Sequence, residues 1–306
     1  MENSSSTGKR GLNFEGRPGE VEITIAPNAG ACFGVVRAIK LGYRALNQAK
    51  DGNVYAFGPL IHNPSVVREL ESRGVQTVTD PNRVDSGTVI LRSHGIQKEI
   101  EADFKSRGVG IVDATCPLVK KPQRIASSLS QKGYFLVVVG DANHPEVKGV
   151  LSYFARPDFL VTYTPRDIEK IPAAVNKVGI IAQTTIELKV LNDVVDAVKA
   201  RFDDVVVNNT ICDATSIRQN EAIALAGNAD VMVVVGGKNS SNTCKLVKIC
   251  QTLQPQTHHI ETIDEIQTDW FLGKSKIGIT GGASTPHDFV DKVGNHIANL
   301  IQTKFS

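Results

Sequence analysis

Short runs of aliphatic residues alternate with helix-like patterns along most of this chain. The runs at 136–139 and 233–235 have the composition and length of buried strands. The segments 123–131 and 188–201 instead place apolar residues at the spacing of one helix face. Strands that alternate with helices are typical of α/β units with parallel strands. The pattern therefore predicts an α/β fold.

The same three landmarks recur in three copies along the chain. The first is a cysteine between an apolar run and a helical pattern. The second is a polar residue four positions after a glycine that ends a strand-like run, and the third is a polar residue in the loop after another short strand. In copy order these residues are Cys32, Cys116 and Cys212, then His62, His144 and Ser240, then His94, Thr184 and Ser284. All three landmarks shift together by about 90 residues, which predicts three related α/β modules.

We expect these modules to span residues 21–108, 109–203 and 204–306 and to have a pseudo-threefold arrangement around one axis. Residues 1–20 are polar and lack a hydrophobic period, so we expect a disordered extension there. In open α/β sheets, ligands collect beyond the carboxyl ends of the strands, where all the landmarks fall. The three sets of loops are therefore expected to face one cavity.

Charge and composition disfavour several classes of function. The chain has 34 basic and 32 acidic residues, a net charge of +2, which gives no electrostatic case for nucleic acid as the main partner. No apolar stretch approaches the roughly 20 residues of a membrane span, so we expect neither a membrane anchor nor a signal peptide. Five cysteines, an odd number, favour reduced thiols and a cytoplasmic location.

The three repeated cysteines are typical of metal ligation. A cysteine near a helix N-terminus is biased toward the thiolate, which is the form that binds metal. Three thiolates complete a tetrahedral zinc site only with a further ligand, whereas a [4Fe–4S] cluster held by three cysteines keeps one iron open as a Lewis acid. We therefore expect Cys32, Cys116 and Cys212 to surround a central iron–sulfur cluster. The alternative for each is a small buried apolar residue.

Cys244 and Cys250 hold no shared position in the repeat. They lie six residues apart on an expected helix, which places them about 240° apart around its axis. Their side chains therefore point to different faces and make a poor chelating pair. We expect both to belong to the core.

The second and third landmarks predict an anion site. Imidazoles, hydroxyls and an amide at helix N-termini can all donate hydrogen bonds to a diphosphate. The candidate residues are His62, His94, His144, Ser240, Ser241, Asn242 and Ser284. Helix capping by Ser241 and structural histidines at turns are the alternatives. No Walker-type phosphate loop is present, so a nucleoside triphosphate is not indicated.

Glu146 is the acidic residue nearest to these landmarks, two positions after His144. A carboxyl group in a cavity with metal and anion can exchange protons with a substrate, and Thr184 could orient that transfer. We expect Glu146 to act as proton donor. Its alternative is a first-turn glutamate that the helix dipole favours.

The motifs together resemble the 4-hydroxy-3-methylbut-2-enyl diphosphate reductase family. The resemblance runs from about Val21 to the C-terminus. The motifs that carry it are Asn28–Val35, Arg92–Gly95, Asp113–Val119, Asn143–Glu146, Ala182–Thr185, Asn209–Cys212, Lys238–Asn242 and Gly282–Ser284.

The resemblance implies an iron–sulfur oxidoreductase of the non-mevalonate isoprenoid pathway. Its reaction, the last step of the pathway, removes the hydroxyl group of the allylic diphosphate and yields isopentenyl and dimethylallyl diphosphate. By this likeness the three cysteines hold a [4Fe–4S] cluster, the histidines, serines and Asn242 hold the diphosphate, and Glu146 and Thr184 deliver protons. Electrons are expected from a ferredoxin or flavodoxin.

Two alternatives remain at this point. A quinolinate synthase-like dehydratase would also use three cysteines, but its carboxylate substrates call for other loop motifs. A non-catalytic iron–sulfur carrier or sensor would need no proton donor beside an anion pocket.

Overall fold

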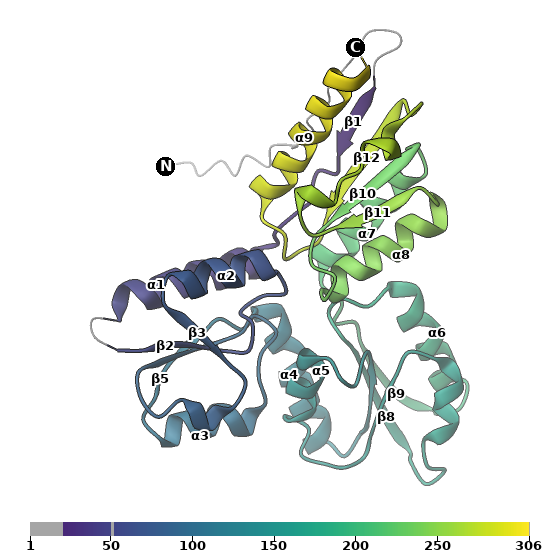
Figure 1. Ribbon diagram of the computed structural model, residues 1–306. Helices are drawn as coiled ribbons and strands as arrows, with labels where there is room; N and C mark the ends of the chain where they lie inside the picture. The colour runs from purple at the N-terminus through teal and green to yellow at the C-terminus, as the bar shows by residue number, and fades with distance from the viewer. Residues whose placement is uncertain (1–20, 50–51, 306) are drawn as a thin grey trace, which may run out of the picture. The chain divides into compact units, whose positions relative to one another are not determined.

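The computed structural model describes residues 21–49 and 52–305, which form three four-stranded parallel sheets (Figure 1). One sheet has the order β3 (Val75–Val78), β2 (Val54–Phe57), β4 (Thr88–Leu91) and β5 (Gly110–Asp113). Another has the order β7 (Phe159–Thr162), β6 (Phe135–Val139), β8 (Lys177–Ala182) and β9 (Asp204–Asn208). The remaining sheet has the order β11 (Thr257–Ile260), β10 (Val231–Val235), β12 (Lys276–Gly281) and β1 (Glu22–Ile25).

The described residues contain nine α-helices, of which eight connect strands and the last follows β12. They are α1 (Phe33–Gln48), α2 (Pro64–Ser72), α3 (Lys98–Ser106), α4 (Pro117–Gln131), α5 (Pro145–Leu151), α6 (Leu188–Lys199), α7 (Asp213–Ala226), α8 (Ser241–Leu253) and α9 (His287–Phe305). Short 3-10 helices occur at Pro81–Arg83, Pro165–Lys170, Ile263–Glu265 and Thr268–Phe271. The expectation of three α/β modules with parallel strands is confirmed.

The sheets do not coincide with the module boundaries expected from the sequence. A boundary at 108/109 separates β5 from β4, with which it pairs, and a boundary at 203/204 separates β9 from β8. Strand β1 likewise pairs with β12 and not with the strands that follow it. The strand that precedes each repeated cysteine, β1, β5 or β9, is thus an edge strand. Strands β5 and β9 each join the sheet of the preceding strands, and β1 joins the last sheet of the chain.

The described residues divide into two compact units. The first contains residues 21–32 and 217–305 and holds the sheet with β1. The second contains residues 33–49 and 52–216 and holds the other two sheets. The expected disorder of residues 1–20 lies outside the described residues. No helix among the described residues is long and apolar enough to cross a bilayer.

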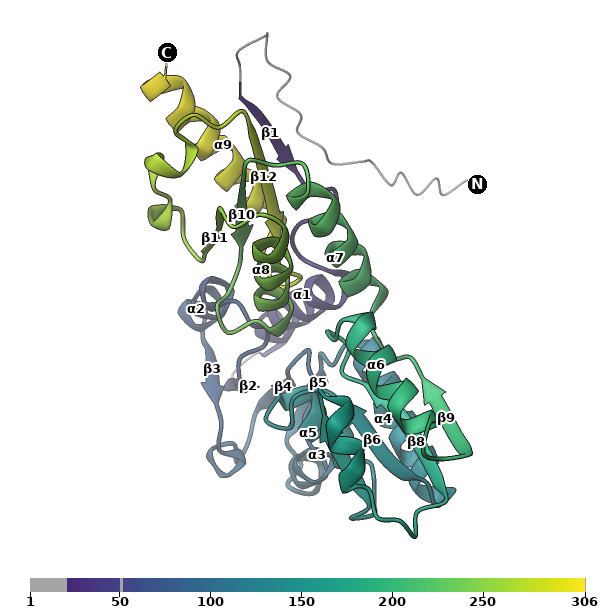
Figure 2. The same ribbon diagram turned by 90° about the vertical axis from the view of Figure 1, so that its right-hand side faces the viewer.

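The central strands are apolar on both faces, as parallel strands between helices must be. In β10, Val231, Val233 and Val235 join a core that includes Val290 and Val293 of α9. The alternate residues, Met232 and Val234, join a core formed with α7 and α8. Figure 2 shows α9 on one side of this sheet and α7 and α8 on the other. Burial on both faces stabilises the sheet, so the loops at the strand ends are the part of it available for binding.

The strand order places a topological switch point in every sheet. In the sheet of order β3-β2-β4-β5, for example, the chain passes from β2 to its neighbour β3 on one side and then crosses to β4 on the other side of β2. The loops that follow β2 and β4 therefore meet beyond the carboxyl ends of adjacent strands, and the same holds for β6 and β8 and for β10 and β12. Ligands of α/β sheets bind at such points. All the predicted anion-binding residues lie in these loops or at the helix starts that follow them.

Candidate functional site

Each of the three repeated cysteines makes the same backbone hydrogen bond. Its N–H donates to a carbonyl in the loop after the neighbouring strand of the same sheet. The bonds are Cys116 to Ser93 at 2.9 Å, Cys212 to Thr184 at 2.9 Å and Cys32 to Ala283 at 3.0 Å. The cysteine turns are therefore tied directly to the loops that carry His94, Thr184 and Ser284.

This hydrogen bond also sets the register between the copies. Thr184 is structurally equivalent to Ser93 and Ala283, so the counterpart of His94 and Ser284 is Thr185. A second set of backbone bonds, Gly95 to Arg92, Ile186 to Gln183 and Thr285 to Gly282, gives the same alignment. Sequence spacing had paired Thr184 with His94 and Ser284, one residue away from the structural register.

The surroundings of the cysteines fit thiolate ligation. Among the described residues none of the three cysteines forms a disulfide, all three are partly exposed, and each immediately precedes or caps a helix, α1, α4 or α7. Cys32 belongs to the first unit, and Cys116 and Cys212 belong to the second. Within the described residues no three His, Cys, Asp or Glu side chains form a site for a single metal ion. A three-cysteine cluster site stays a prediction.

Cys250 and Cys244 lie in different environments. Cys250 is fully buried between α7, α8 and β10, as expected, and burial raises the pKa of its thiol to about 12. The core position predicted for Cys244 is wrong, because its thiol is partly exposed and donates to the carbonyl oxygen of Lys238 at 3.0 Å. Six residues, about 1.7 helical turns, separate these two environments.

Three imidazoles gather in the second unit. The ring centroids of His62 and His94 lie 4.0 Å apart, and those of His144 lie 5.8 Å from His62 and 6.0 Å from His94. Burial, aided by the charge of Arg92, lowers the pKa of His62 to about 4. Burial also holds the pKa of His94 well below its ordinary value, and His62, His144 and Arg92 lower it further. The structure thus brings the three predicted histidines together in a setting that disfavours the charged forms of His62 and His94.

Glu146 and Thr184 are in direct contact. The carboxylate of Glu146 is 1% exposed and accepts hydrogen bonds from the N–H and the hydroxyl of Thr184, each at 2.7 Å. The backbone N–H of Glu146 donates to Nδ1 of His144 at 3.1 Å. Because the carbonyl of Thr184 accepts from Cys212, a single residue separates the buried carboxylate from a cysteine turn.

The first unit holds the serine and asparagine candidates. Ser240 and Ser284 are buried, and their hydroxyl oxygens lie 3.4 Å apart. The side chain of Asn242 is 4% exposed, and within the described part of the chain both its amide nitrogen and its oxygen lack a hydrogen-bond partner. An unsatisfied buried amide costs about 1–3 kcal/mol, which a polar ligand would recover. The unsatisfied, buried side chain of Asn242 therefore points to a bound ligand.

Helix capping differs from the sequence expectation at one position. The side chains of Asn63, His144 and Ser240 cap α2, α5 and α8. The cap considered for Ser241 thus belongs to Ser240, whose hydroxyl accepts from the N–H of Thr243. Ser241 is the first residue of α8.

Sequence reasoning missed two positioning residues, which align with each other in the register above. Arg92 lies at the histidine cluster and donates from Nε to the carbonyl of Gly95 at 3.1 Å. Gln183 accepts from the N–H of Asp141 and donates to the hydroxyl of Thr185, so it links the loops after β6 and β8. Both stand within motifs quoted above, but their aligned positions are visible only from the backbone bonds.

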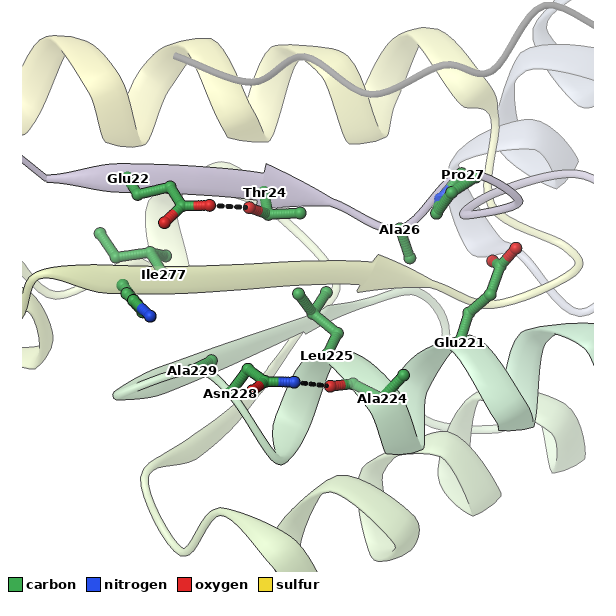
Figure 3. Close-up of a pocket in the computed structure, with 11 residues that line it drawn as sticks. Glu22, Thr24, Ala26, Pro27, Glu221, Ala224, Leu225, Asn228, Ala229 and Ile277 are labelled. Carbon is green, nitrogen blue, oxygen red and sulfur yellow. Dashed lines mark hydrogen bonds between the residues drawn. The ribbon is translucent and has the colours of Figure 1, made fainter. Parts of the chain in front are cut away.

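A groove of about 410 Å³ opens in the first unit between β1, β12 and α7 (Figure 3). None of the predicted site residues lines it. At one end, the carboxylate of Glu221 accepts from the N–H and the side-chain amide of Asn28, at 2.9 and 2.6 Å. Arg218 of the same helix donates twice to the carbonyl of Gly30. This part of α7 therefore fixes the turn that leads to Cys32.

Comparison with known families decides what kind of protein carries these parts. A family model described as LytB protein matches residues 23–298. The chain belongs to the LytB protein family.

Relatives and solved structures agree with this assignment. Proteins named 4-hydroxy-3-methylbut-2-enyl diphosphate reductase from Geobacter sp. (strain M21) and from Citrifermentans bemidjiense are each 46% identical over 288 residues, 94% of this chain and 100% of theirs. A solved structure of (E)-4-hydroxy-3-methyl-but-2-enyl diphosphate reductase, the terminal enzyme of the non-mevalonate pathway, is 43% identical with a TM-score of 0.69 and covers 90% of this chain and 99% of its own.

A second solved structure is more distant in sequence. The E-1-hydroxy-2-methyl-but-2-enyl-4-diphosphate reductase from Plasmodium falciparum is 28% identical, with a TM-score of 0.84 over 90% of this chain and 87% of its own. The resemblance expected from the motifs is confirmed. Membership of this family also decides against a quinolinate synthase-like protein.

Proposed function

We propose that this LytB family protein is a 4-hydroxy-3-methylbut-2-enyl diphosphate reductase. It removes the hydroxyl group of the allylic diphosphate and forms isopentenyl and dimethylallyl diphosphate. The reaction consumes two electrons and two protons, breaks the C–O bond, forms a C–H bond and releases water. The observation that carries the proposal is the buried Glu146, held by Thr184 between the histidine cluster and the Cys212 turn.

Diphosphate binding falls to the histidine cluster and to the polar loops of the first unit. His62, His94 and His144 offer ring nitrogens from three loops of the second unit, and Arg92 adds a permanent positive charge beside them. In the first unit, Ser240, Ser241, Asn242 and Ser284 offer hydroxyls and an amide, and the unsatisfied side chain of Asn242 supports this role. Thr185 joins the candidate set through its register with His94 and Ser284.

We propose that Cys32, Cys116 and Cys212 hold a [4Fe–4S] cluster. Each of the three cysteines donates an equivalent backbone hydrogen bond and lies at the start of a helix. This setting supports thiolate ligation. When bound, such a cluster supplies electrons and, through an iron without a cysteine ligand, Lewis acidity.

Proton delivery is assigned to Glu146. Its two oxygens face the N–H and the hydroxyl of Thr184, so the carboxyl group has one fixed orientation in the structure. Thr184 orients the carboxyl group, and its hydroxyl can pass a proton on. Burial excludes water and leaves proton exchange to these groups.

Electrons reach the protein from a one-electron carrier such as a ferredoxin or flavodoxin, and a cytoplasmic location suits both partners. A non-catalytic carrier or sensor, the remaining alternative, would leave the buried Glu146–Thr184 pair beside the histidine cluster without a task. That pair favours the catalytic role.

The cluster assignment is tested by iron content. After anaerobic reconstitution with iron and sulfide, Cys32→Ser, Cys116→Ser and Cys212→Ser are expected to lose most of the bound iron. Cys244→Ser and Cys250→Ser are matched controls that keep it, because neither lies in the repeated turn. Equal iron loss at all five positions would contradict the assignment.

A further inference from the structure

The charge of the second unit is unevenly distributed over its helices. Helices α1 and α4, which begin directly after Cys32 and Cys116, contain six basic residues and no acidic one. The basic residues are Arg37, Lys40, Arg44, Lys120, Lys121 and Arg124. The whole chain has nearly balanced charge, with 34 basic and 32 acidic residues. The excess of positive charge is thus a local property of the two helices beside the cysteines.

The starts of α1 and α4 lie next to each other. Arg37 donates from its guanidinium to the carbonyl oxygens of Thr115, at 3.2 Å, and Asp113, at 3.3 Å. These carbonyls belong to the turn that carries Cys116, so the first turns of α1 lie against that cysteine turn. Two exposed apolar side chains stand at the same place.

Phe33, which directly follows Cys32, is 72% exposed. Leu118, two residues after Cys116, is 45% exposed. Phe33 shares one helix face with Arg37 and Lys40 at spacings of four and seven residues. An exposed aromatic residue with basic neighbours has the composition of a protein docking site, an apolar centre with a charged rim.

Some of the basic side chains at the rim are available to a partner, and others are engaged within the protein. Lys120 is paired with Asp113, and Arg37 is engaged with backbone carbonyls. No ion pair of Lys40, Lys121 or Arg124 is present among the described residues, and all three side chains are exposed. Lys40 lies about 10 Å along α1 from Phe33. The cationic rim therefore extends well beyond the cysteine turns.

We propose that this surface, defined by Phe33 and Leu118 with the basic residues of α1 and α4, docks an acidic one-electron carrier protein. The inference rests on the proposed function, because a reductase needs two electrons for each substrate molecule. Two reduced carriers dock in succession, each gives up one electron and each leaves oxidised. Weak, electrostatically steered complexes of this kind bury a small interface and are short-lived. A partly exposed patch suits such a complex better than a large apolar interface would.

The experiment compares a protein donor with a small-molecule donor. The double variant Lys40→Glu/Lys121→Glu reverses two rim charges, and Arg166→Glu/Lys199→Glu is the control with the same charge change at other exposed sites of the second unit. Turnover of the allylic diphosphate is measured with reduced ferredoxin, with reduced flavodoxin and with a reduced sulfonated viologen, whose oxidised form is neutral.

The surface variant is expected to lose about tenfold or more in kcat/KM for the protein donors, and the wild-type rate with them should fall as salt rises. Viologen-driven turnover and the KM for the diphosphate should be unchanged in both variants. Unchanged carrier-driven rates in the surface variant, or wild-type protein that turns over with viologen but with neither carrier, would overturn the docking proposal. A raised diphosphate KM would show that the charges serve the substrate instead. Absence of viologen-driven turnover in the wild type would defeat the proposed function itself.

Discussion

At the scale of single residues, Glu146 links the parts of the site. Its backbone N–H donates to His144, and its carboxylate accepts from the N–H and the hydroxyl of Thr184. The carbonyl oxygen of Thr184 in turn accepts a hydrogen bond from the N–H of Cys212. A carboxyl group that only stabilised the first turn of a helix would be solvent-exposed, as Glu99 is at the same position of α3. The full burial of Glu146 therefore distinguishes it from an ordinary first-turn glutamate.

Glu146→Gln is expected to lower turnover about 10²–10⁴-fold, because the amide cannot donate the proton. The cluster content and the affinity for substrate should stay near those of the wild type, since the amide is similar in shape. Glu99→Gln, a change at an equivalent helix position, should have no effect. Steady-state rates with viologen and iron analysis of all three proteins check this, and full turnover in Glu146→Gln would remove Glu146 from the mechanism.

The proposed diphosphate binding at the histidine cluster is expected to depend on pH. Burial and Arg92 lower the pKa of His62 to about 4 in the free protein, and a bound diphosphate, being anionic, must raise it. Between the pKa of the free protein and that of the complex, binding takes up a proton, so the affinity for inorganic diphosphate should rise as pH falls. Calorimetry at pH 6 in buffers of different ionisation enthalpy should show proton uptake that His62→Asn reduces. Tight binding without proton uptake would contradict the assignment.

Residue identities in the site were largely predictable, but their register was not. Cys32 and His94 could be found because each follows a strand-like run and fits a repeat, and Glu146 because it lies two positions after His144. Arg92 and Gln183 escaped notice, since a cation and an amide in a loop have ordinary solvent-exposed roles. The equivalence of Thr185 with His94 depends on backbone hydrogen bonds that residue spacing does not encode.

At the scale of elements, the turn before Cys32 depends on glycine. Gly30 has φ +102°, and a Cβ there would lie 2.7 Å from Nδ1 of His287 and 3.2 Å from the carbonyl of Thr285. His287 itself binds the carbonyl of Ala29 at 2.9 Å. The turn before Cys32 therefore tolerates neither a side chain nor an ordinary backbone conformation.

Gly30→Ala is expected to lower the free energy of unfolding by more than the roughly 1–2 kcal/mol cost of left-handed backbone alone. Gly108→Ala is the matched control, because Gly108 has φ +72° and a Cβ there would meet no atom within 4 Å. Denaturant unfolding of both variants gives the difference. Iron content should fall in Gly30→Ala only, and equal losses of stability in the two variants would argue against a tightly packed Cys32 turn.

The pairing of strands was beyond the reach of sequence. The alternation of strands and helices predicted three α/β modules, and the structure contains three parallel sheets. Which edge strand joins which sheet is decided by nonlocal contacts, such as those of β1 with β12, whose residues lie more than 250 positions apart. Parallel pairing carries no turn signal, so module boundaries drawn by period alone divided all three sheets.

At the scale of the whole molecule, the residues proposed for function come from both compact units. The first unit contributes Cys32 and the loops with Ser240, Asn242 and Ser284, and the second contributes the other cysteines, the histidines and Glu146. The family resemblance read from the sequence covered both, and the match over residues 23–298 does so as well. The pseudo-threefold arrangement around a cluster stays a prediction.

The most direct test of the proposed reductase activity is an anaerobic dye assay. Protein reconstituted with iron and sulfide is mixed with a reduced viologen, and dye oxidation is followed on addition of 4-hydroxy-3-methylbut-2-enyl diphosphate. We expect rapid oxidation that depends on substrate, consumes two electrons for each molecule and yields isopentenyl and dimethylallyl diphosphate. Cluster-loaded protein that leaves the dye reduced in the presence of this substrate would contradict the proposed activity.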